Sequence, residues 1–326
     1  MTEESLASKI PVNRVTIDDI RAAAQRIEAY VHRTPVMSSR LIDTEAGCEI
    51  FFKCENLQKV GAFKARGAHN AVLCLTPEQL ARGVATHSSG NHAAALALAA
   101  SHFDVPAYIV MPENAPATKV AAVRAYGGQI TFCESTQAAR ESTLQELCAS
   151  TGASFIPPYD HPDVIAGQGT AALELAGQLT PPPDFLLTPV GGGGLLAGCA
   201  VASKALWPGT AVIGAEPAGA DDALRSFHSG QWQPQPAPET VADGLRTALG
   251  QLNFQLIREN VDDILSADDA TIIRATRLVW TRMKLVIEPS AAVGLAVVLA
   301  HPHRFAGKRV AIVFSGGNVD IDQLPW

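Results

Sequence analysis

The chain has 326 residues, of which 47% are hydrophobic and 17% are charged, and its formal net charge is −7 at pH 7. This composition excludes intrinsic disorder and fibrous structure, and the length allows about two ordinary domains with a large buried core. The acidic charge argues against nucleic-acid binding, and no apolar run reaches the ~18 residues that a membrane span needs.

The first half of the sequence alternates short strands with helices. Apolar residues recur with the period of a strand or a helix, and glycines or polar residues separate the segments. Strands are expected at 49–53, 83–87, 106–111 and 129–133, and helices at 91–103, 118–126 and 136–150. Compact βα units of this kind form a small parallel sheet that helices cover on both faces.

The second half repeats this order with longer helices. Helices are expected at 165–179, 195–207, 268–283 and 291–301, and strands at 185–190, 211–216 and 309–314. The first strands would pair with the C-terminal half. Residues 83–156 would then form a small inserted domain, and residues 1–82 plus 157–326 a large one. The predicted fold class is α/β, with two doubly wound parallel-sheet domains.

The cysteines and the start of the chain indicate a compartment. The start MTEESLASKI carries acids and lacks the basic and then apolar order of a signal peptide. The six cysteines show no CxxC or metal-finger spacing, and those inside apolar runs are expected to be buried free thiols. Reduced thiols without an export signal predict a cytoplasmic protein.

Three glycine-containing turns follow predicted strands, at residues 88–91, 191–194 and 315–318. Each places open backbone N–H groups at the carboxyl edge of a parallel sheet, where α/β proteins bind ligands. The second turn precedes a helix and suits a single phosphate; it is called the glycine loop below and consists of Gly191, Gly192, Gly193 and Gly194. It matches neither GxGxxG nor GK[ST], which disfavours a dinucleotide or a nucleoside triphosphate. A tight turn without a ligand is the alternative.

Lys64 is the candidate for covalent chemistry. It follows Gly61, Ala62 and Phe63 at a predicted helix start and precedes further small residues. A lysine held against apolar neighbours and near cations has a lowered pKa, which makes its amine a usable nucleophile. Taken alone, such a residue is more often a surface lysine.

Six motifs, in this order, carry a resemblance to a known family: AFKARGA, THSSGNHAAAL, PVGGGGLLAG, GAEPAGADD, KLVIEPSAAVG and FSGGNVD. The chain resembles the fold-type II (tryptophan synthase β-like) pyridoxal-5′-phosphate (PLP) enzymes, and among them the serine racemase and serine–threonine dehydratase group. The resemblance covers nearly the whole chain, from about Val15 to Asp320. The motif SSGNH in place of SGNT argues against a cysteine synthase.

The resemblance implies a role for each residue around the cofactor. Lys64 would carry PLP, Phe63 would pack beside its ring, and Asn91 would hydrogen-bond its phenolic oxygen. The glycine loop and the amide of Leu195 would hold the phosphate. Ser315 would face the pyridine nitrogen, where a hydroxyl cannot enforce protonation, so the ring would favour elimination over transamination.

By the same resemblance, the substrate carboxylate would lie at a helix N-terminus, on a segment called the serine turn below: Ser88, Ser89, Gly90, Asn91 and His92. In threonine dehydratases without racemase activity, the position that matches Ser89 resembles an alanine. Racemases use a serine there as the acid/base on the face opposite the lysine, because inverting an α-carbon needs a proton donor on each face. A carboxylate-binding hydroxyl without a proton role is the alternative.

Glu216, Asp222 and the carbonyl of Ala220 match the divalent-cation site of this group. Ligand sets made only of oxygen suit Mg²⁺, Ca²⁺ or Mn²⁺ better than zinc. The spacing alone would favour helix capping by Asp221 or Asp222 instead. The order of the family motifs favours the metal.

The sequence departs from the family at three positions. Ala62 replaces the serine that is common before the Phe-Lys pair, and Val60 and Ala94 are apolar where animal racemases have polar residues that help bind a nucleotide. The resemblance therefore does not extend to control by ATP. It does imply a homodimer.

The predicted function is PLP-dependent β-elimination, in which an ammonia-lyase converts L-serine, L-threonine or 3-hydroxyaspartate to a 2-oxo acid and ammonia. The alternatives are an amino-acid racemase of serine or aspartate type, a bifunctional racemase and dehydratase, and a non-catalytic PLP carrier. Arg140 or Arg246 would select 3-hydroxyaspartate by gripping its second carboxylate with two parallel hydrogen bonds. A surface or domain-interface arginine is the alternative for each.

Overall fold

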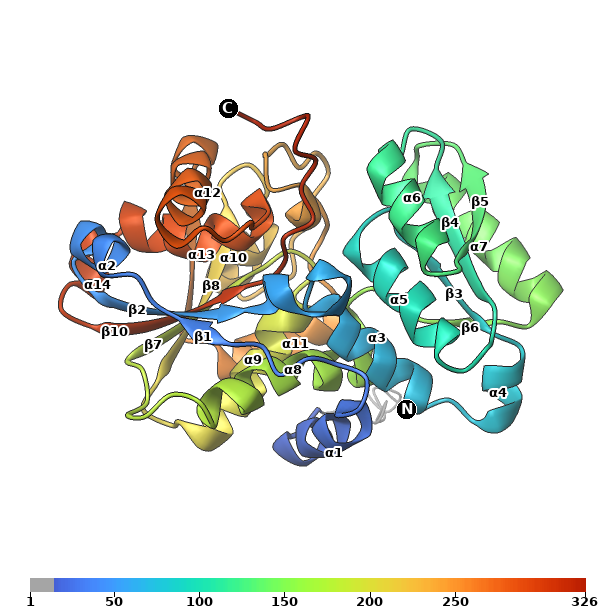
Figure 1. Ribbon diagram of the computed structural model, residues 1–326, viewed down its shortest axis with the longest axis horizontal. Helices are drawn as coiled ribbons and strands as arrows, with labels where there is room; N and C mark the ends of the chain where they lie inside the picture. Colours follow the sequence, from blue (N-terminus) through green and yellow to red (C-terminus); the bar gives the residue numbers. More distant parts are fainter. Residues whose placement is uncertain (1–14) are drawn as a thin grey trace, which may run out of the picture.

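The computed structural model describes residues 15–326. The acidic N-terminal segment, from which we predicted the absence of a signal peptide, lies outside the described residues. Two sheets stand in two lobes side by side (Figure 1), one with strand order β1-β2-β10-β7-β8-β9 and one with order β5-β4-β3-β6. In residues 15–326 no helix is long and apolar enough to cross a membrane.

The six-stranded sheet joins the two ends of the chain. Strand β2 pairs in parallel with β10 along its whole length, from Glu49 beside Arg309 to Cys54 beside Phe314, so the predicted pairing with the C-terminal half is confirmed. Strand β1 runs antiparallel to β2 at the sheet edge and departs from an all-parallel sheet. The strands are β1 (Val36–Met37), β2 (Glu49–Cys54), β7 (Phe185–Pro189), β8 (Ala211–Pro217), β9 (Asp263–Ala267) and β10 (Arg309–Phe314).

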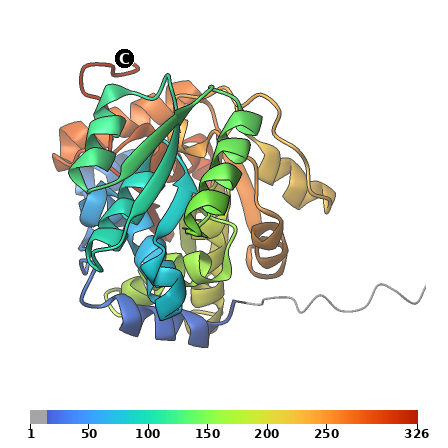
Figure 2. The same ribbon diagram turned by 90° about the vertical axis from the view of Figure 1, so that its right-hand side faces the viewer.

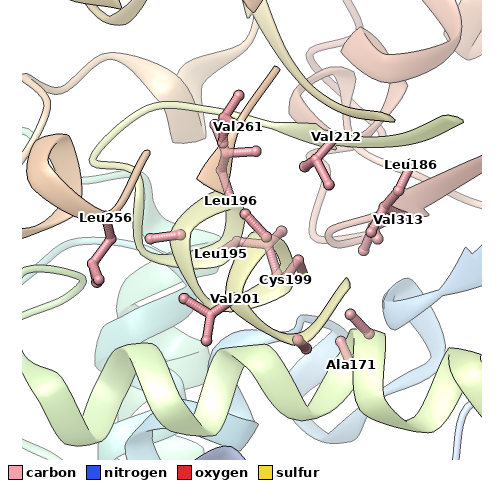
Figure 3. Packing of buried hydrophobic residues seen from close by; sticks show 14 of the residues in the cluster. Ala171, Leu186, Leu195, Leu196, Cys199, Val201, Val212, Leu256, Val261 and Val313 are labelled. Atoms are coloured by element: carbon pink, nitrogen blue, oxygen red, sulfur yellow. The ribbon is translucent and has the colours of Figure 1, made fainter. Parts of the chain in front are cut away.

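Helices cover both faces of this sheet because its strands alternate between two cores. Leu186, Val212 and Val313 face one core, and Leu187 and Ile213 face the other. Figure 3 shows the first core, where side chains from three strands meet helix α9. The helices on the first face include α8 (Pro162–Ala176), α9 (Gly194–Leu206) and α11 (Gln251–Asn260), and those on the second include α2 (Arg40–Ala46), α12 (Asp269–Met283) and α13 (Pro289–Ala300).

The four-stranded sheet is parallel throughout and is also covered on both faces. Val84 and Ile109 pack with helices α5 and α6, whereas Ala85 and Val110 pack with α7. Figure 2 shows α7 on one side of this sheet and α6 on the other. Its elements are β3 (Val84–His87), α5 (Asn91–Ser101), β4 (Ala107–Pro112), α6 (Ala117–Ala125), β5 (Gln129–Cys133), α7 (Gln137–Thr151) and β6 (Ser154–Phe155). These bounds support proposing residues 83–156 as an inserted small domain and 1–82 plus 157–326 as the large one.

Helix α3 (Lys64–Leu73) lies between the two lobes and packs on both α5 and α8. The approach to α8 is close because glycines meet there. A Cβ on Gly67 would lie 2.8 Å from the carbonyl oxygen of Val164, and one on Gly167 would lie 2.6 Å from the Cα of Gly67. The helix that begins with Lys64 is therefore held tightly between the lobes.

Several elements differ from the sequence prediction or were missed by it. Helix α8 begins at Pro162 and not at 165, because the His161 side chain accepts the Asp163 amide and a proline fits the first turn. Helix α1 was missed although Thr16 and Asp19 form a capping box at its start. Helix α1 spans Ile17–Ile27. The other missed elements are β1, α2, α4 (Pro77–Ala81), β6, α10 (Asp222–Ser229), α11, β9 and α14 (Pro302–Phe305).

The expectation of free thiols is confirmed, since all six cysteines are unpaired. Four of them are buried: Cys48, Cys54, Cys133 and Cys199. The expected burial is wrong for Cys74, which stands in an apolar run but is exposed.

Candidate active site

A cavity of about 580 Å³ lies between the two lobes, where strands β3, β7 and β10 end. His87, Pro189 and Ser315 mark these three strand ends on its wall. The carboxyl ends of parallel strands form the usual ligand site of α/β folds. The cavity brings together every residue predicted for the cofactor and the substrate: Phe63, Lys64, Ser88, Ser89, Gly90, Asn91, His92, Arg140, Gly191, Gly192, Gly193, Gly194, Leu195 and Ser315.

Lys64 is the first residue of α3, and its amine lies inside the cavity. Nζ donates a hydrogen bond to the carbonyl of Pro158 and lies 5.1 Å from the ring centroid of Phe63 and 5.9 Å from that of Tyr159. Burial lowers the pKa of Lys64 to about 7. The sequence reasoning also invoked nearby cations, which was wrong, because burial alone accounts for the shift. Near neutral pH the amine is therefore partly unprotonated and able to act as a nucleophile or a base.

The glycine loop presents open amides to the cavity. Within the described part of the chain, no backbone N–H from Gly191 to Leu195 donates a hydrogen bond. Glycine is required at two of these positions. A Cβ on Gly192 would collide with the ring of Tyr159, and Gly193 has a φ of +91° at the start of α9. Open amides at a helix N-terminus, on a loop that only glycine can form, fit a phosphate group.

The serine turn leads into α5, which begins at Asn91. The amide of Gly90 donates to Ser88 Oγ at 3.4 Å, whereas the Ser89 hydroxyl has no hydrogen-bond partner among residues 15–326. His92 Nε2 contacts the Ile156 carbonyl at 2.9 Å. Burial, with a smaller effect of Lys64, lowers the pKa of His92 to about 3, so its imidazole is neutral. The turn thus offers one free hydroxyl beside a helix N-terminus.

Asn91 is held by a carboxyl group that the sequence reasoning missed. Asn91 Nδ2 donates to both oxygens of Glu288 at 3.0 and 3.3 Å, and Asn91 Oδ1 accepts from Asn318 Nδ2 at 2.9 Å. Glu288 is buried on the cavity wall, and burial followed by the charge of Asp243 raises its pKa to about 7. The signal was present, since this glutamate precedes a proline at a helix start inside one of the quoted motifs.

The two candidate arginines differ in what already binds them. Arg246 donates to the carbonyl of Thr240 through both Nε, at 2.8 Å, and Nη2. Arg140 of α7 makes one weak bond, from Nε to the carbonyl of Thr136 at 3.4 Å, and no other among the described residues. Both line the cavity, but only Arg140 has both terminal nitrogens open.

The three predicted metal ligands lie outside this cavity. The oxygens of Glu216 accept the amides of Ala223 at 3.0 Å and Leu224 at 2.8 Å, so Glu216 caps α10. Asp222 Oδ2 accepts the amide of Leu249 at 2.7 Å, and Asp222 Oδ1 is buried without a partner in the described part. Burial raises the pKa of both carboxyl groups. The orphaned oxygen and two buried acids fit a divalent cation, although residues 15–326 hold no cluster of three or more His, Cys, Asp or Glu suited to a metal.

The alternative interpretation of this site, helix capping by Asp221 or Asp222, named the wrong residue. Asp221 stands at the N-cap of α10 but makes no side-chain capping bond, and its carboxylate pairs with Arg225 at 2.8 Å. Glu216, near the end of β8, caps α10 instead.

A second cavity of about 600 Å³ adjoins the first, and Val60 and Ala94 line it. Between the two cavities, Lys119 of α6 forms an ion pair of 2.5 Å with Asp243, which joins the small lobe to the large one. These are the two positions at which animal racemases have polar residues that help bind a nucleotide. That this chain lacks control by ATP stays a prediction.

Comparison with known proteins shows the family to which the chain belongs. The sequence profile described as "Pyridoxal-phosphate dependent enzyme" matches residues 27–316. The chain belongs to this family. As a PLP-dependent enzyme it has a cofactor that the cavity fits, because the open amides suit the phosphate and Lys64, with its lowered pKa, suits covalent attachment.

Characterised relatives cover nearly all of this PLP enzyme. It is 48% identical to a beta-hydroxyaspartate dehydratase of Paracoccus denitrificans, over 95% of this chain and 98% of the relative. It is 48% identical to an L-threo-3-hydroxyaspartate ammonia-lyase of Saccharomyces cerevisiae, over 94% of each chain. The crystal structure of serine racemase from Dictyostelium discoideum matches with a TM-score of 0.90 and 48% identity, over 94% of this chain and 99% of that one. The predicted fold-type II architecture is thereby confirmed.

Proposed function

We propose that this PLP enzyme is an ammonia-lyase that converts a β-hydroxy amino acid to a 2-oxo acid and ammonia. The observation that carries the proposal is the Lys64 amine, with its pKa lowered to about 7, in one cavity with the open glycine loop and the serine turn. The two hydroxyaspartate lyases among the relatives support this reaction type. The same cavity gives the chain a base, a phosphate site and a carboxylate site.

The cofactor roles follow from the contacts of each residue. We propose that the amides from Gly191 to Leu195 hold the phosphate and that Phe63 packs beside the ring. Asn91 would donate to the phenolic oxygen, with its amide oriented by Glu288 and Asn318. The Ser315 hydroxyl would face the ring nitrogen. When bound, PLP withdraws electrons from the α-carbon of an attached amino acid and so acidifies its hydrogen.

The chain's own residues then move protons. The serine turn would bind the substrate carboxylate at the N-terminus of α5, where the amides of Asn91 and His92 donate to no other group in the described structure. This contact directs the α-hydrogen toward Lys64, whose Nζ removes the proton. The β-hydroxyl takes up that proton and leaves as water, and later hydrolysis returns one water and releases ammonia. The net reaction involves no oxidant or reductant.

Ser89 supports the second candidate function, an amino-acid racemase. Its hydroxyl lines the cavity without a partner in the described structure, so it is free to carry a proton. We propose that Ser89 and Lys64 act on opposite faces of the α-carbon. A serine racemase with the same fold is consistent with this assignment. Elimination remains the main proposal, and racemisation would accompany it.

Arg140 favours a substrate with a second carboxylate. Its two terminal nitrogens are open in the described structure, whereas Nε and one terminal nitrogen, Nη2, of Arg246 already donate to the Thr240 carbonyl. A guanidinium grips a carboxylate through two parallel hydrogen bonds. We therefore propose 3-hydroxyaspartate as a preferred substrate, with Arg140 as the carboxylate ligand. The names of two relatives support the same substrate class.

We propose that a divalent cation, Mg²⁺, Mn²⁺ or Ca²⁺, binds Glu216, Asp222 and the carbonyl of Ala220. Each acid is buried, and a cation would stabilise both charges where no basic side chain bonds to either within residues 15–326. Outside the catalytic cavity, the ion would act on stability and on the geometry of the α10 start.

We propose that the enzyme works in the cytoplasm as a homodimer. Six unpaired cysteines suit a reducing compartment. Leu57 and Val286 are 44% and 50% exposed, and a hydrogen bond of 3.0 Å from Asn56 Nδ2 to the Val286 carbonyl holds their segments together. Exposed apolar side chains of this kind suit a subunit contact. Sedimentation of the purified enzyme tests the oligomeric state.

The proposed reaction is tested with a panel of substrates on the purified enzyme loaded with PLP. The panel contains serine, threonine and 3-hydroxyaspartate as both enantiomers and, where they exist, both diastereomers. The proposal expects 2-oxo acid and ammonia in equal amounts, with the highest kcat/KM on a hydroxyaspartate isomer. Absence of 2-oxo acid from every substrate would contradict the lyase assignment.

A further inference from the structure

The carbonyl oxygen of Gly192, in the middle of the glycine loop, accepts two hydrogen bonds from the start of α11. Asn253 Nδ2 donates at 2.6 Å and the amide of Gly250 donates at 3.1 Å. Neither Gly250 nor Asn253 lines the catalytic cavity. The carbonyl is therefore held toward the interior of the large lobe, on the side of α11.

This contact sets the direction of an amide that faces the cavity. The Gly192 carbonyl and the Gly193 N–H belong to one planar trans peptide, and in such a peptide these two groups point in opposite directions. Holding the carbonyl toward α11 thus turns the Gly193 N–H toward the cavity. Glycine on both sides of the peptide would otherwise allow it to rotate, because glycine accepts both signs of φ.

Asn253 is itself fixed in place. Its side chain is fully buried at the third residue of α11, and its backbone amide donates to Asp160 Oδ1 at 3.1 Å. Asp160 Oδ2 accepts the amide of Gln251 at 3.0 Å, so this carboxylate caps the helix. The Cβ of Asn253 would lie only 2.9 Å from a Cβ on Gly193, which leaves the loop no space to shift toward α11.

We propose that Asn253 is a positioning residue that acts through Gly192 to present the Gly193 amide to the phosphate of PLP. The inference rests on the proposed phosphate site in the glycine loop. It adds a residue outside the cavity, on a helix that the sequence analysis did not identify. Removing the Asn253 side-chain donor should weaken recognition of the phosphate and leave recognition of the ring unchanged.

Binding of PLP and of pyridoxal, which lacks the phosphate, to the apoenzyme tests this inference by fluorescence titration. Asn253→Ala should weaken PLP binding by about tenfold or more, the range of one lost hydrogen bond to a buried carbonyl, with pyridoxal binding unchanged. Asn253→Asp keeps the size but places a carboxylate oxygen against the Gly192 carbonyl, and should weaken PLP binding at least as much. Asn260→Ala is the control, because within residues 15–326 that amide on the same helix donates only to the Leu256 carbonyl.

The outcomes separate this inference from the assignments on which it rests. Equal losses for PLP and pyridoxal in both Asn253 variants would show a general structural effect and overturn the positioning role. Unchanged PLP binding in Asn253→Asp would overturn it as well. If the native apoenzyme binds PLP no more tightly than pyridoxal, the phosphate site itself is wrong, and the positioning role fails with it.

Discussion

The backbone amide of Phe63 donates a hydrogen bond of 3.0 Å to the carbonyl of Ser315. This bond ties the start of α3, where Lys64 stands, to the end of β10. A bridge between Ala62 and Gly316 reinforces it. The lysine and the proposed partner of the ring nitrogen are thereby held in fixed relation, although they lie at opposite ends of the chain.

Lys64→Ala should abolish the visible absorbance of covalently bound PLP. Lys64 is a half-buried lysine that lines the cavity, with its pKa lowered to about 7. The measurement is the absorbance spectrum of purified protein, followed by borohydride reduction and peptide mapping. Lys308→Ala, a change at an exposed lysine, should leave both unchanged. A reducible PLP adduct on another residue of the Lys64 variant would refute the assignment.

The stability of the apoenzyme should report the titration of Lys64. Burial lowers its pKa from 10.5 to about 7, so between these values the unfolded chain binds the extra proton. The resulting destabilisation is fully present below about pH 7 and disappears as the pH rises toward the unfolded pKa of about 10.5. Lys64→Met should therefore be more stable than the native apoenzyme at about pH 6 and similar to it near pH 10. Urea unfolding at both pH values checks this, and a pH-independent difference would contradict it.

Removal of the proposed cation should lower the melting temperature. A ligand that binds only the folded state stabilises it by about 2.7 kcal/mol at a hundredfold excess over its Kd. EDTA should lower the Tm, and Mg²⁺ or Mn²⁺ should restore it. Glu216→Gln and Asp222→Asn should remove this response, whereas Asp221→Asn should keep it, because Asp221 pairs with Arg225 instead. If neither the chelator nor the metal changes the Tm of the native enzyme, the cation site is wrong and Glu216 serves only as a helix cap.

Arg140→Lys should change the substrate preference. Loss of a bidentate, charge-assisted contact should lower kcat/KM on 3-hydroxyaspartate by about 10- to 100-fold, with little change on serine. Arg246→Lys is the matched control, since its guanidinium already binds the Thr240 carbonyl. Steady-state kinetics on both substrates decide. Equal losses on serine and hydroxyaspartate would return Arg140 to a structural role.

Ser89→Ala should separate the two faces of the substrate. If Ser89 carries a proton on the face opposite Lys64, the variant loses racemisation and elimination from D-substrates by about 10²- to 10⁴-fold, mostly in kcat. Elimination from L-substrates should persist, because Lys64 alone takes that proton. A role in carboxylate binding would instead raise KM for both enantiomers. Comparable damage to L- and D-serine would therefore contradict the proton role.

The strands and helices that carry strong apolar periodicity could be predicted from sequence. Strands β5 and β10 were predicted to the residue, and the prediction that a helix begins at Lys64 was confirmed. Helix α11 was missed because its start is stabilised by Asp160, a residue far away in sequence. Strand β9 was missed because its burial alternates weakly, and its position depends on pairing with β8.

The active-site motifs were recognisable because the turns require glycine and the covalent chemistry requires a lysine. The residues that orient the cavity side chains could not be predicted, since they act through contacts between segments that are distant in the sequence. Glu288 acts on Asn91 from the other lobe, and Asn253 reaches Gly192 through a helix end. The pairing of these residues leaves no spacing pattern in the sequence, although Glu288 itself stands before a proline at a helix start inside a quoted motif. The capping of α10 by Glu216 in place of Asp221 is a local contact, because Glu216 lies seven and eight residues before the two amides that it accepts.

The central claim is that this enzyme converts a β-hydroxy amino acid to a 2-oxo acid and ammonia, with Lys64 as the base. The most direct measurement follows L-threo-3-hydroxyaspartate and L-serine in deuterated water, recording the 2-oxo acid, ammonia and the D-isomer together. The account predicts equal amounts of 2-oxo acid and ammonia, in excess over any deuterated D-isomer, and none of these from the Lys64→Ala variant. Deuterated D-isomer without 2-oxo acid would make the enzyme a racemase, and absence of every product would contradict the account.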